Sequence, residues 1–274
     1  MGFENLFNLF TYEFIRNAFL AGIFISLGFS VLSSLLFVKD CTLLGHGLSD
    51  IGFATFSVAS ALNASPVFVS IPLMVLITFF IICFSQSRKY SASSLIAVFS
   101  TLALAIGIAV ASLNKGINSN VYSYMFGSIF SVSTKDLIFS IVVNSFAVLV
   151  FSLFYNKILL IFLDEDFAKS RGFNIIFYRF LMSLLIASVT VLGIKMVGTL
   201  LVSSFMVFPA LISKKMSNSF KGLVILSFVF SILSFTAGML ISFILNIPTG
   251  ATIVFVNVIL VIFLSFRRFA KRYC

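Results

Sequence analysis

Long apolar runs separated by short polar segments dominate the chain and indicate helices that cross a membrane. A helix needs about 20 residues to cross the hydrocarbon core, and about 17–25 with tilt. Three of the runs are short and fit broken or steeply placed helices, so eight or ten crossings are also compatible. The pattern predicts an all-α, polytopic membrane bundle with about nine elements, at roughly 14–38, 48–62, 67–84, 93–113, 137–163, 177–195, 197–213, 223–245 and 251–266.

Composition supports a membrane protein. Of the 274 residues, 61% are hydrophobic and 9% are charged, and the mean hydropathy is +1.20. A soluble domain needs far more charge to cover its surface. Residues 1–13 carry two acids and no base, the reverse of a signal peptide, so we expect the first span itself to direct insertion.

The 18 Lys and Arg residues are distributed unequally between the two sides of the predicted bundle. Alternating the nine elements leaves four bases on one side: Arg16, Lys115, Lys135 and Lys195. The other fourteen fall on the opposite side, which the positive-inside rule makes cytoplasmic. The net charge of +10 therefore reflects membrane topology, and a nucleic-acid partner is not expected.

This topology divides the chain into three parts. We expect residues 1–13 to be an N-terminal extracytoplasmic segment, residues 14–266 to form the transmembrane domain, and residues 267–274 to be a basic cytoplasmic tail. The N-terminus is then outside and the C-terminus on the cytoplasmic side of the membrane.

His46, the sole histidine, and Asp50 are the best candidates for chemistry. Residues four apart on a helix project from the same face, with Cβ atoms about 6 Å apart. An unpaired carboxylate in a membrane helix costs roughly 2.5–3.5 kcal/mol on insertion scales. Imidazole suits zinc, and carboxylate suits manganese or ferrous iron. The pair therefore fits a site for a divalent metal, or alternatively a hydrogen-bonded pair lining a polar crevice.

Residues 164–172 predict a small capped helix on the cytoplasmic side. Acids stand at its N-terminal end, bases in its last turn, and Gly172 after it, as the helix dipole and C-cap geometry favour. A polar helix displayed on that face suits docking to another protein. A connector held at the lipid headgroups is the alternative.

Other chemistries lack their motifs. The spacing from Gly193 to Gly198 continues with Thr199 rather than Lys, so no Walker A motif is present and an ATPase would be a separate chain. Ser49 lies near His46, but GxSxG and HExxH are absent, which argues against a hydrolase. Three isolated cysteines give neither a disulfide framework nor a thiolate metal site.

Five segments, in order, resemble the permease subunits of ABC importers for zinc, manganese or iron, the ABC-3 family. They cover about residues 14–266 and are LLGHGLSDIGF (43–53), SYMFGSIFSVS (123–133), DEDFA with Arg171 and Gly172 (164–172), VGTLLVSS through Pro209 and Ala210 (197–210), and PTGATIV (248–254).

The resemblance implies a type II importer-like fold and a set of partners. It implies a homodimer in the lipid membrane around a central translocation pathway, two ATP-binding subunits, and an extracytoplasmic metal-binding protein. The metal is then cargo, no cofactor is bound permanently, and the chain itself is not an enzyme. The coupling helix that seats in the ATPase would carry Asp164, Glu165, Asp166, Ala168, Arg171 and Gly172.

The chain departs from the family pattern at the metal pair. Family members usually have Asp at position 46 and His at position 50, and here the two residues are exchanged. Both donors remain on one helix face, so we expect His46 and Asp50 to contact the transported metal, with a different ligand geometry. The sequence does not identify that metal.

Two other classes of protein remain open at this level. A secondary transporter coupled to protons or sodium would show internal repeats and acids at matched positions, and no convincing repeat is present. A membrane scaffold or sensor would need no ATPase. A gene for a Walker A protein beside this one, or an ATPase that copurifies, would favour the ATP-driven permease.

Overall fold

The computed structural model describes residues 13–38, 42–84, 92–113, 127, 133–245 and 247–273. All regular elements in these ranges are helices. They are α2 (Glu13–Val38), α3 (Thr42–Ala61), α4 (Pro66–Phe84), α5 (Ala92–Leu113), α7 (Thr134–Leu153), α8 (Tyr155–Leu163), α9 (Glu165–Ser170), α10 (Ile175–Val197), α11 (Thr199–Lys214), α12 (Phe220–Leu245) and α13 (Thr249–Tyr273).

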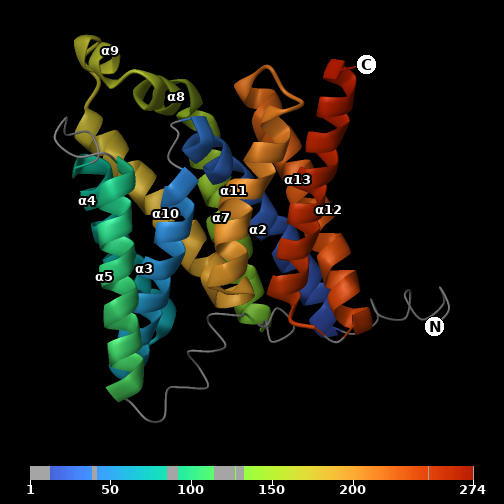
Figure 1. The fold of residues 1–274 in the computed structure, drawn as a ribbon. Coiled ribbons are helices and arrows are strands. Elements are labelled where there is room, and N and C mark those ends of the chain that lie inside the picture. The colour runs from blue at the N-terminus through green and yellow to red at the C-terminus, as the bar shows by residue number, and fades with distance from the viewer. Residues whose placement is uncertain are drawn as a thin grey trace.

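Successive long helices run in alternating directions through one bundle (Figure 1). The first described helix, α2, begins at the end of the bundle opposite to the short helix α9. The last one, α13, finishes at the same end as α9. Eight of the nine predicted elements correspond to one helix each, the fifth corresponds to α7 and α8 together, and α9 is an additional short helix.

Six of the described helices are long and apolar enough to cross a membrane. They lie within α2, α4, α5, α7, α10 and α12, and shorter apolar helices occur at Thr199–Lys214 and Thr249–Ser265. α3 has 20 residues but is more polar. The prediction of an all-helical, multi-pass membrane bundle is confirmed.

Two predicted boundaries were wrong. The second element begins at Thr42 rather than at residue 48, so His46 and Asp50 lie inside a helix and not at its entrance. The run at 137–163 is divided at Phe154 into α7 and α8. Phe154 packs edge-on against Tyr178 of α10, and this tertiary contact accompanies the change of direction into α8.

α2 and α10 are the most buried of the six spanning helices, and they form the centre of the bundle. Small polar residues help α2 approach α12, where the hydroxyl oxygens of Ser34 and Ser227 lie 3.4 Å apart. Small residues serve this purpose in membranes because lipid gives helices no hydrophobic reason to associate. This close approach fixes the position of α12 against α2.

Two expectations concern segments that the structure describes only in part. The extracytoplasmic segment 1–13 lies outside the described residues, except for Glu13. The expected cytoplasmic tail at 267–274 continues α13 as far as Tyr273.

Candidate functional site

Close packing on both sides of His46 fixes α3 in the bundle. A Cβ atom added to Gly45 would lie 2.6 Å from Cβ of Met206 on α11. One added to Gly47 would lie 2.6 Å from Cγ2 of Ile96 on α5. Only glycine permits these approaches, so α3 is wedged between α5 and α11 at the level of His46. Packing thus supports a helix that its own glycines would weaken.

His46 and Asp50 project from the same face of α3, as their spacing predicts. Nε2 of His46 lies 4.0 Å from Oδ2 of Asp50, and the two side chains are 71% and 24% exposed. This distance exceeds that of a direct hydrogen bond. Among the described residues, this is the only polar contact of the Asp50 carboxylate. Both groups therefore keep free lone-pair positions.

Ser49 does not take part in this pair. Its hydroxyl donates to the backbone carbonyl of His46 at 2.6 Å, and Ser49 is buried. The serine is therefore engaged within its own helix, as is common for serines in apolar helices. This geometry gives no support to a serine nucleophile.

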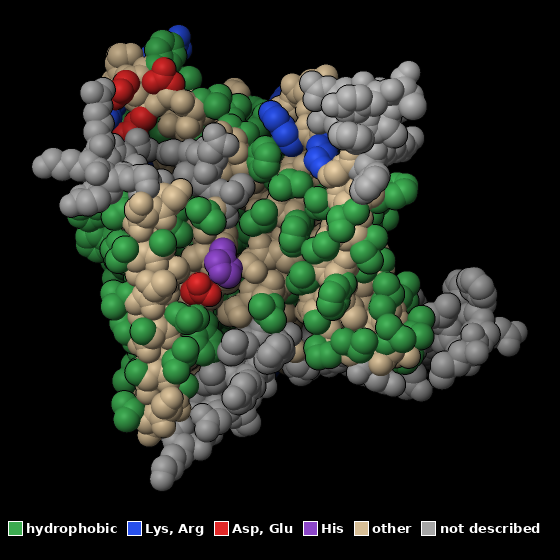
Figure 2. Space-filling view, in the orientation of Figure 1, with side chains coloured by type: hydrophobic (Ala, Val, Ile, Leu, Met, Phe, Trp, Pro, Cys, Tyr) green, Lys and Arg blue, Asp and Glu red, His purple; other side chains and the backbone are tan. Residues whose placement is uncertain are grey.

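His46 faces an open groove of about 420 Å³ between α3, α11 and α13. Figure 2 shows the histidine, in purple, with an acidic side chain beside it in a recess of a mainly apolar face. The other acids visible on that face lie at the end of the molecule that carries α9. The groove is lined by His46, Leu200, Ser203, Ser204, Val207, Phe208, Ala251, Val254 and Phe255.

A polar contact joins the two helices on the far side of this groove. Nδ2 of Asn257 on α13 donates to the hydroxyl of Ser204 on α11 at 3.1 Å. Asn257 is fully buried, and its Oδ1 has no partner among the described residues. Eight of the nine lining residues fall within the segments 43–53, 197–210 and 248–254 that resemble the family, but the sequence did not show that these segments meet, because they belong to three separate helices.

The donor types fit a divalent transition metal that binds transiently. A tetrahedral ion with bonds of about 2.0–2.1 Å holds its ligand atoms about 3.4 Å apart. The 4.0 Å separation of Nε2 and Oδ2 needs only a small rotamer adjustment to reach this value. No group of three or more His, Cys, Asp or Glu residues occurs in the described part of the chain. Two protein ligands from one chain do not complete a structural metal site.

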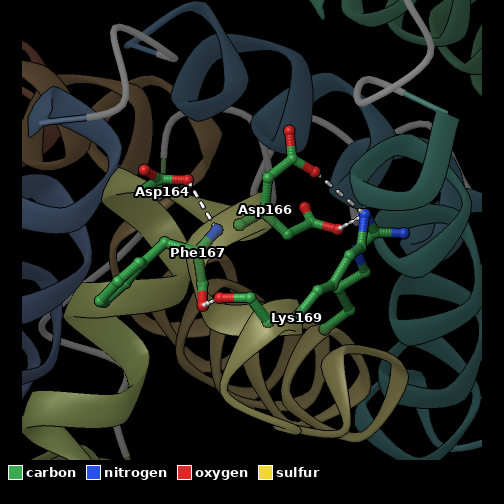
Figure 3. Close-up of polar contacts among 7 residues, drawn as sticks. Asp164, Asp166, Phe167 and Lys169 are labelled. Carbon is green, nitrogen blue, oxygen red and sulfur yellow. Dashed lines mark hydrogen bonds and ion pairs between the residues drawn. The ribbon is translucent and has the colours of Figure 1, made fainter.

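The predicted coupling segment forms a short helix with strong caps (Figure 3). The Asp164 carboxylate accepts a hydrogen bond from the backbone N–H of Phe167 at 3.0 Å. Gly172 adopts φ +76°, and the N–H groups of Gly172 and Phe173 donate to the carbonyls of Lys169 and Ala168. These bonds satisfy both ends of a helix that is too short to be stable alone.

The six residues of this segment divide into exposed and buried groups. Asp164, Asp166, Arg171 and Gly172 are exposed, and the Arg171 guanidinium lies 4.8 Å from the Phe167 ring centre. Ala168 is fully buried and holds α9 against the bundle. The acids and the arginine are therefore free to meet another surface.

Glu165 alone among these six is engaged with a spanning helix. Its carboxylate pairs with Arg179 of α10 and with Lys169 of α9, the latter at 3.2 Å. Burial favours the neutral acid, but the hydrogen bonds from Arg179 and Lys169 outweigh it and hold the pKa of Glu165 below its ordinary value. From the sequence, Arg179 was expected only to be one of the cytoplasmic bases, although an arginine inside an apolar run is itself a signal of a specific partner.

A second ion pair joins α7 and α10 at the opposite end of the bundle. Lys195 pairs with Asp136, which also accepts a hydrogen bond from the Ser133 hydroxyl. Ser133 caps α7 through the Asp136 N–H. The pairing of Lys195 with Asp136 was not predicted from the sequence, because the two residues are 59 positions apart and meet only through the packing of α7 and α10.

These observations define a class of protein: a multi-pass helical membrane protein with two metal-type ligands on one helix, one of which lines an open groove. The model of the ABC 3 transport family matches residues 11–268. The chain therefore belongs to that family, whose members act in metal transport as membrane permeases.

Curated relatives align along most of the chain. The manganese transport system membrane protein MntC of Halalkalibacterium halodurans is 26% identical over 249 residues, which are 90% of this chain and 85% of the relative. The high-affinity zinc uptake system membrane protein ZnuB of Buchnera aphidicola from Acyrthosiphon pisum is 28% identical over 245 residues, covering 89% and 93%.

A solved structure has the same fold. A chain of PsaBC from Streptococcus pneumoniae, in complex with a Fab, superposes with a TM-score of 0.84 at 22% identity. The match covers 95% of this chain and 94% of that one. The bundle described above is therefore the fold of that solved chain.

Proposed function

We propose that this chain is the membrane permease of an ATP-driven importer of divalent transition metal, with zinc, manganese or iron as cargo. The observation that carries the proposal is the His46–Asp50 pair, of which His46 lines an open groove within a membrane bundle and Asp50 lies 4.0 Å from it. The pair supplies two ligands, and no group of three or more metal-type ligands occurs in the described part of the chain. The chain belongs to a metal transport family. A mobile ion that passes through needs such a weak, incomplete site more than a closed one.

The open groove supports a homodimer around the pathway. His46 is 71% exposed on a face that lies at membrane depth, where an exposed imidazole and carboxylate are costly. A second copy placed over α3, α11 and α13 would cover the groove and bring a second pair of ligands near the first. The pathway then runs between the two copies.

The capped helix at 164–172 supports an ATPase partner. We assign Asp164, Glu165, Asp166, Ala168, Arg171 and Gly172 to the coupling segment, with the exposed acids and Arg171 facing a separate ATP-binding subunit. Exposed charges of this kind mainly set specificity and association rate. An extracytoplasmic metal-binding protein would deliver the cargo to the opposite end of the bundle.

The orientation follows from the side on which this segment lies. If α9 meets an ATPase, its end of the bundle is cytoplasmic, and the C-terminal end of α13 is on the same side. The beginning of α2 is then extracytoplasmic. This orientation agrees with the distribution of Lys and Arg, and we propose the cytoplasmic membrane of a bacterium as the location.

Metal uptake by the reconstituted complex tests the site. A variant with His46→Ala and Asp50→Ala loses both donors, and we expect ATP-dependent uptake of Mn²⁺ or Zn²⁺ to fall by about a hundredfold, since two ligand contacts are lost. The matched control is His46→Asp with Asp50→His, which keeps both donors in the order usual for the family. We expect it to retain measurable uptake. Undiminished uptake by the double alanine variant would refute the site.

A further inference from the structure

Among the described residues, the Glu165–Arg179 pair is the single polar side-chain contact between the capped helix α9 and the spanning helix α10. The side chains are 8% and 16% exposed, so water screens the pair poorly. They line a void of about 10 Å³ together with apolar residues of α4, α8 and α10, namely Ile82, Ile158, Ile161, Phe162, Tyr178 and Met182.

The Glu165–Arg179 pair adds a side-chain connection to the short backbone link between α9 and α10. Only residues 171–174 connect α9 to α10, and they include Gly172 in the left-handed region. The carboxylate and guanidinium add a second connection 14 residues apart in sequence. Together with the buried Ala168, this connection leaves α9 less free to rotate against α10 than the linker alone would.

α10 carries this connection through the bundle (Figure 1). It is 23 residues long, about 35 Å at 1.5 Å per residue, and its interior contains neither glycine nor proline in the first four turns. Near its other end, Ile194 packs on Gly52 of α3, only two residues beyond Asp50. α10 therefore touches the helix that holds the metal ligands.

α10 ends one residue before α11, whose first residues line the groove. Gly198, with φ +86°, is both the last cap of α10 and the first cap of α11. Leu200 and Ser203, in the first turn and a half of α11, line the groove beside His46. A shift of α10 along or about its axis must move these side chains, because a single residue separates the two helices.

We propose that the Glu165–Arg179 ion pair is the joint through which movement of α9 reaches the His46 groove. Arg179 is a positioning residue: it contacts neither cargo nor ATPase, and it ties the docking helix to a rigid helix that contacts both α3 and the start of α11. The inference rests on the proposed function, because it assumes that α9 docks to an ATPase.

The deciding variant is Glu165→Gln with Arg179→Met, which removes both charges and leaves none unpaired. The matched control is Lys169→Met. Lys169 also pairs with Glu165 at 3.2 Å, but it lies on α9 itself and is 56% exposed. The control therefore removes a cation from Glu165 without separating α9 from α10.

Three quantities are measured on the permease–ATPase complex in proteoliposomes: copurification of the ATPase, ATP hydrolysis, and metal imported per ATP. For the double variant we expect copurification and hydrolysis to persist, and metal per ATP to fall about tenfold, within the usual range of coupling between sites. For Lys169→Met we expect a change of less than about twofold, as for an exposed pair. Arg179→Lys should restore part of the coupling.

Unchanged metal per ATP in the double variant would overturn the proposal. Loss of the ATPase from the double variant would also overturn it, because the pair would then shape the docking surface rather than transmit movement. If the unaltered complex imports no metal with ATP, the proposed function itself fails, and that result is separate from either outcome.

Discussion

Two acid–base pairs of this protein differ in almost every physical respect. His46 and Asp50 are 4.0 Å apart, and the histidine is largely exposed and lines an open groove. Glu165 and Arg179 are nearly buried and in direct contact. Nε2 of His46 and Oδ2 of Asp50 are too far apart for a direct hydrogen bond, so both can reach a ligand. In the second pair the guanidinium already contacts Oε1 of the carboxylate, while Oε2 of Glu165 and Nε of Arg179 are buried without a partner among the described residues. The first, open pair suits cargo, and the second, buried pair suits a mechanical connection.

Removing one partner should lower the stability of the fold most at the buried Glu165–Arg179 pair. Arg179→Ala leaves the Glu165 carboxylate nearly buried with only the exposed Lys169 beside it. We expect the variant to lose about 3 kcal/mol of stability, as when a buried pair is broken. Thermal unfolding in detergent measures the loss. Glu165→Gln with Arg179→Met should recover most of it, and equal losses in both variants would mean that packing, not charge, is responsible.

Removing the charge of Asp50 from the open His46–Asp50 pair should instead raise the stability of the fold. Asp50→Asn removes a half-buried charge that has no hydrogen bond among the described residues, so we expect unfolding without metal to require about 1 kcal/mol more than in the unaltered chain. Added Mn²⁺ or Zn²⁺ should stabilise the unaltered chain and leave the variant unchanged. A variant that is stabilised equally by metal would show that cargo binds elsewhere.

Lowering the pH should have a smaller effect, on the stability that the Glu165–Arg179 pair contributes. The pKa of Glu165 lies below its ordinary value, so its pairing stabilises the fold at neutral pH. That contribution starts to fall as pH drops below the unfolded value of about 4.3 and disappears below the folded one. The difference in unfolding temperature between the unaltered chain and the Glu165→Gln, Arg179→Met variant should therefore shrink only below about pH 4.3. A difference that already shrinks between pH 7 and 6 would contradict this.

Local patterns predicted much of this molecule. The apolar runs indicated all nine long helices, and the acids, bases and glycine at 164–172 indicated α9. The spacing of His46 and Asp50 placed both on one helix face. Each of these features depends on residues within a few turns of one another, which is the range that helix periodicity and capping cover.

Contacts between distant segments were not predictable from one sequence. The start of α3 at Thr42 depends on Gly45 and Gly47 fitting against Met206 and Ile96. A glycine-rich stretch looks unfavourable for a helix until its neighbours are known. The partners of Glu165 and Lys195 are likewise set by the packing of α10, since many acids and bases would satisfy the same charge rule.

The glycine shared by α10 and α11 has a consequence for the surrounding lipid. α11 has 16 residues, about 24 Å, whereas the hydrocarbon layer is about 30 Å thick. α11 is therefore shorter than this layer is thick, and backbone groups without a partner are costly inside it. The Gly198 N–H donates to the Ile194 carbonyl, and the Gly198 carbonyl accepts from the Val202 N–H. Both backbone groups of this residue thus have a partner, so the reversal between α10 and α11 would tolerate an apolar surrounding as well as water.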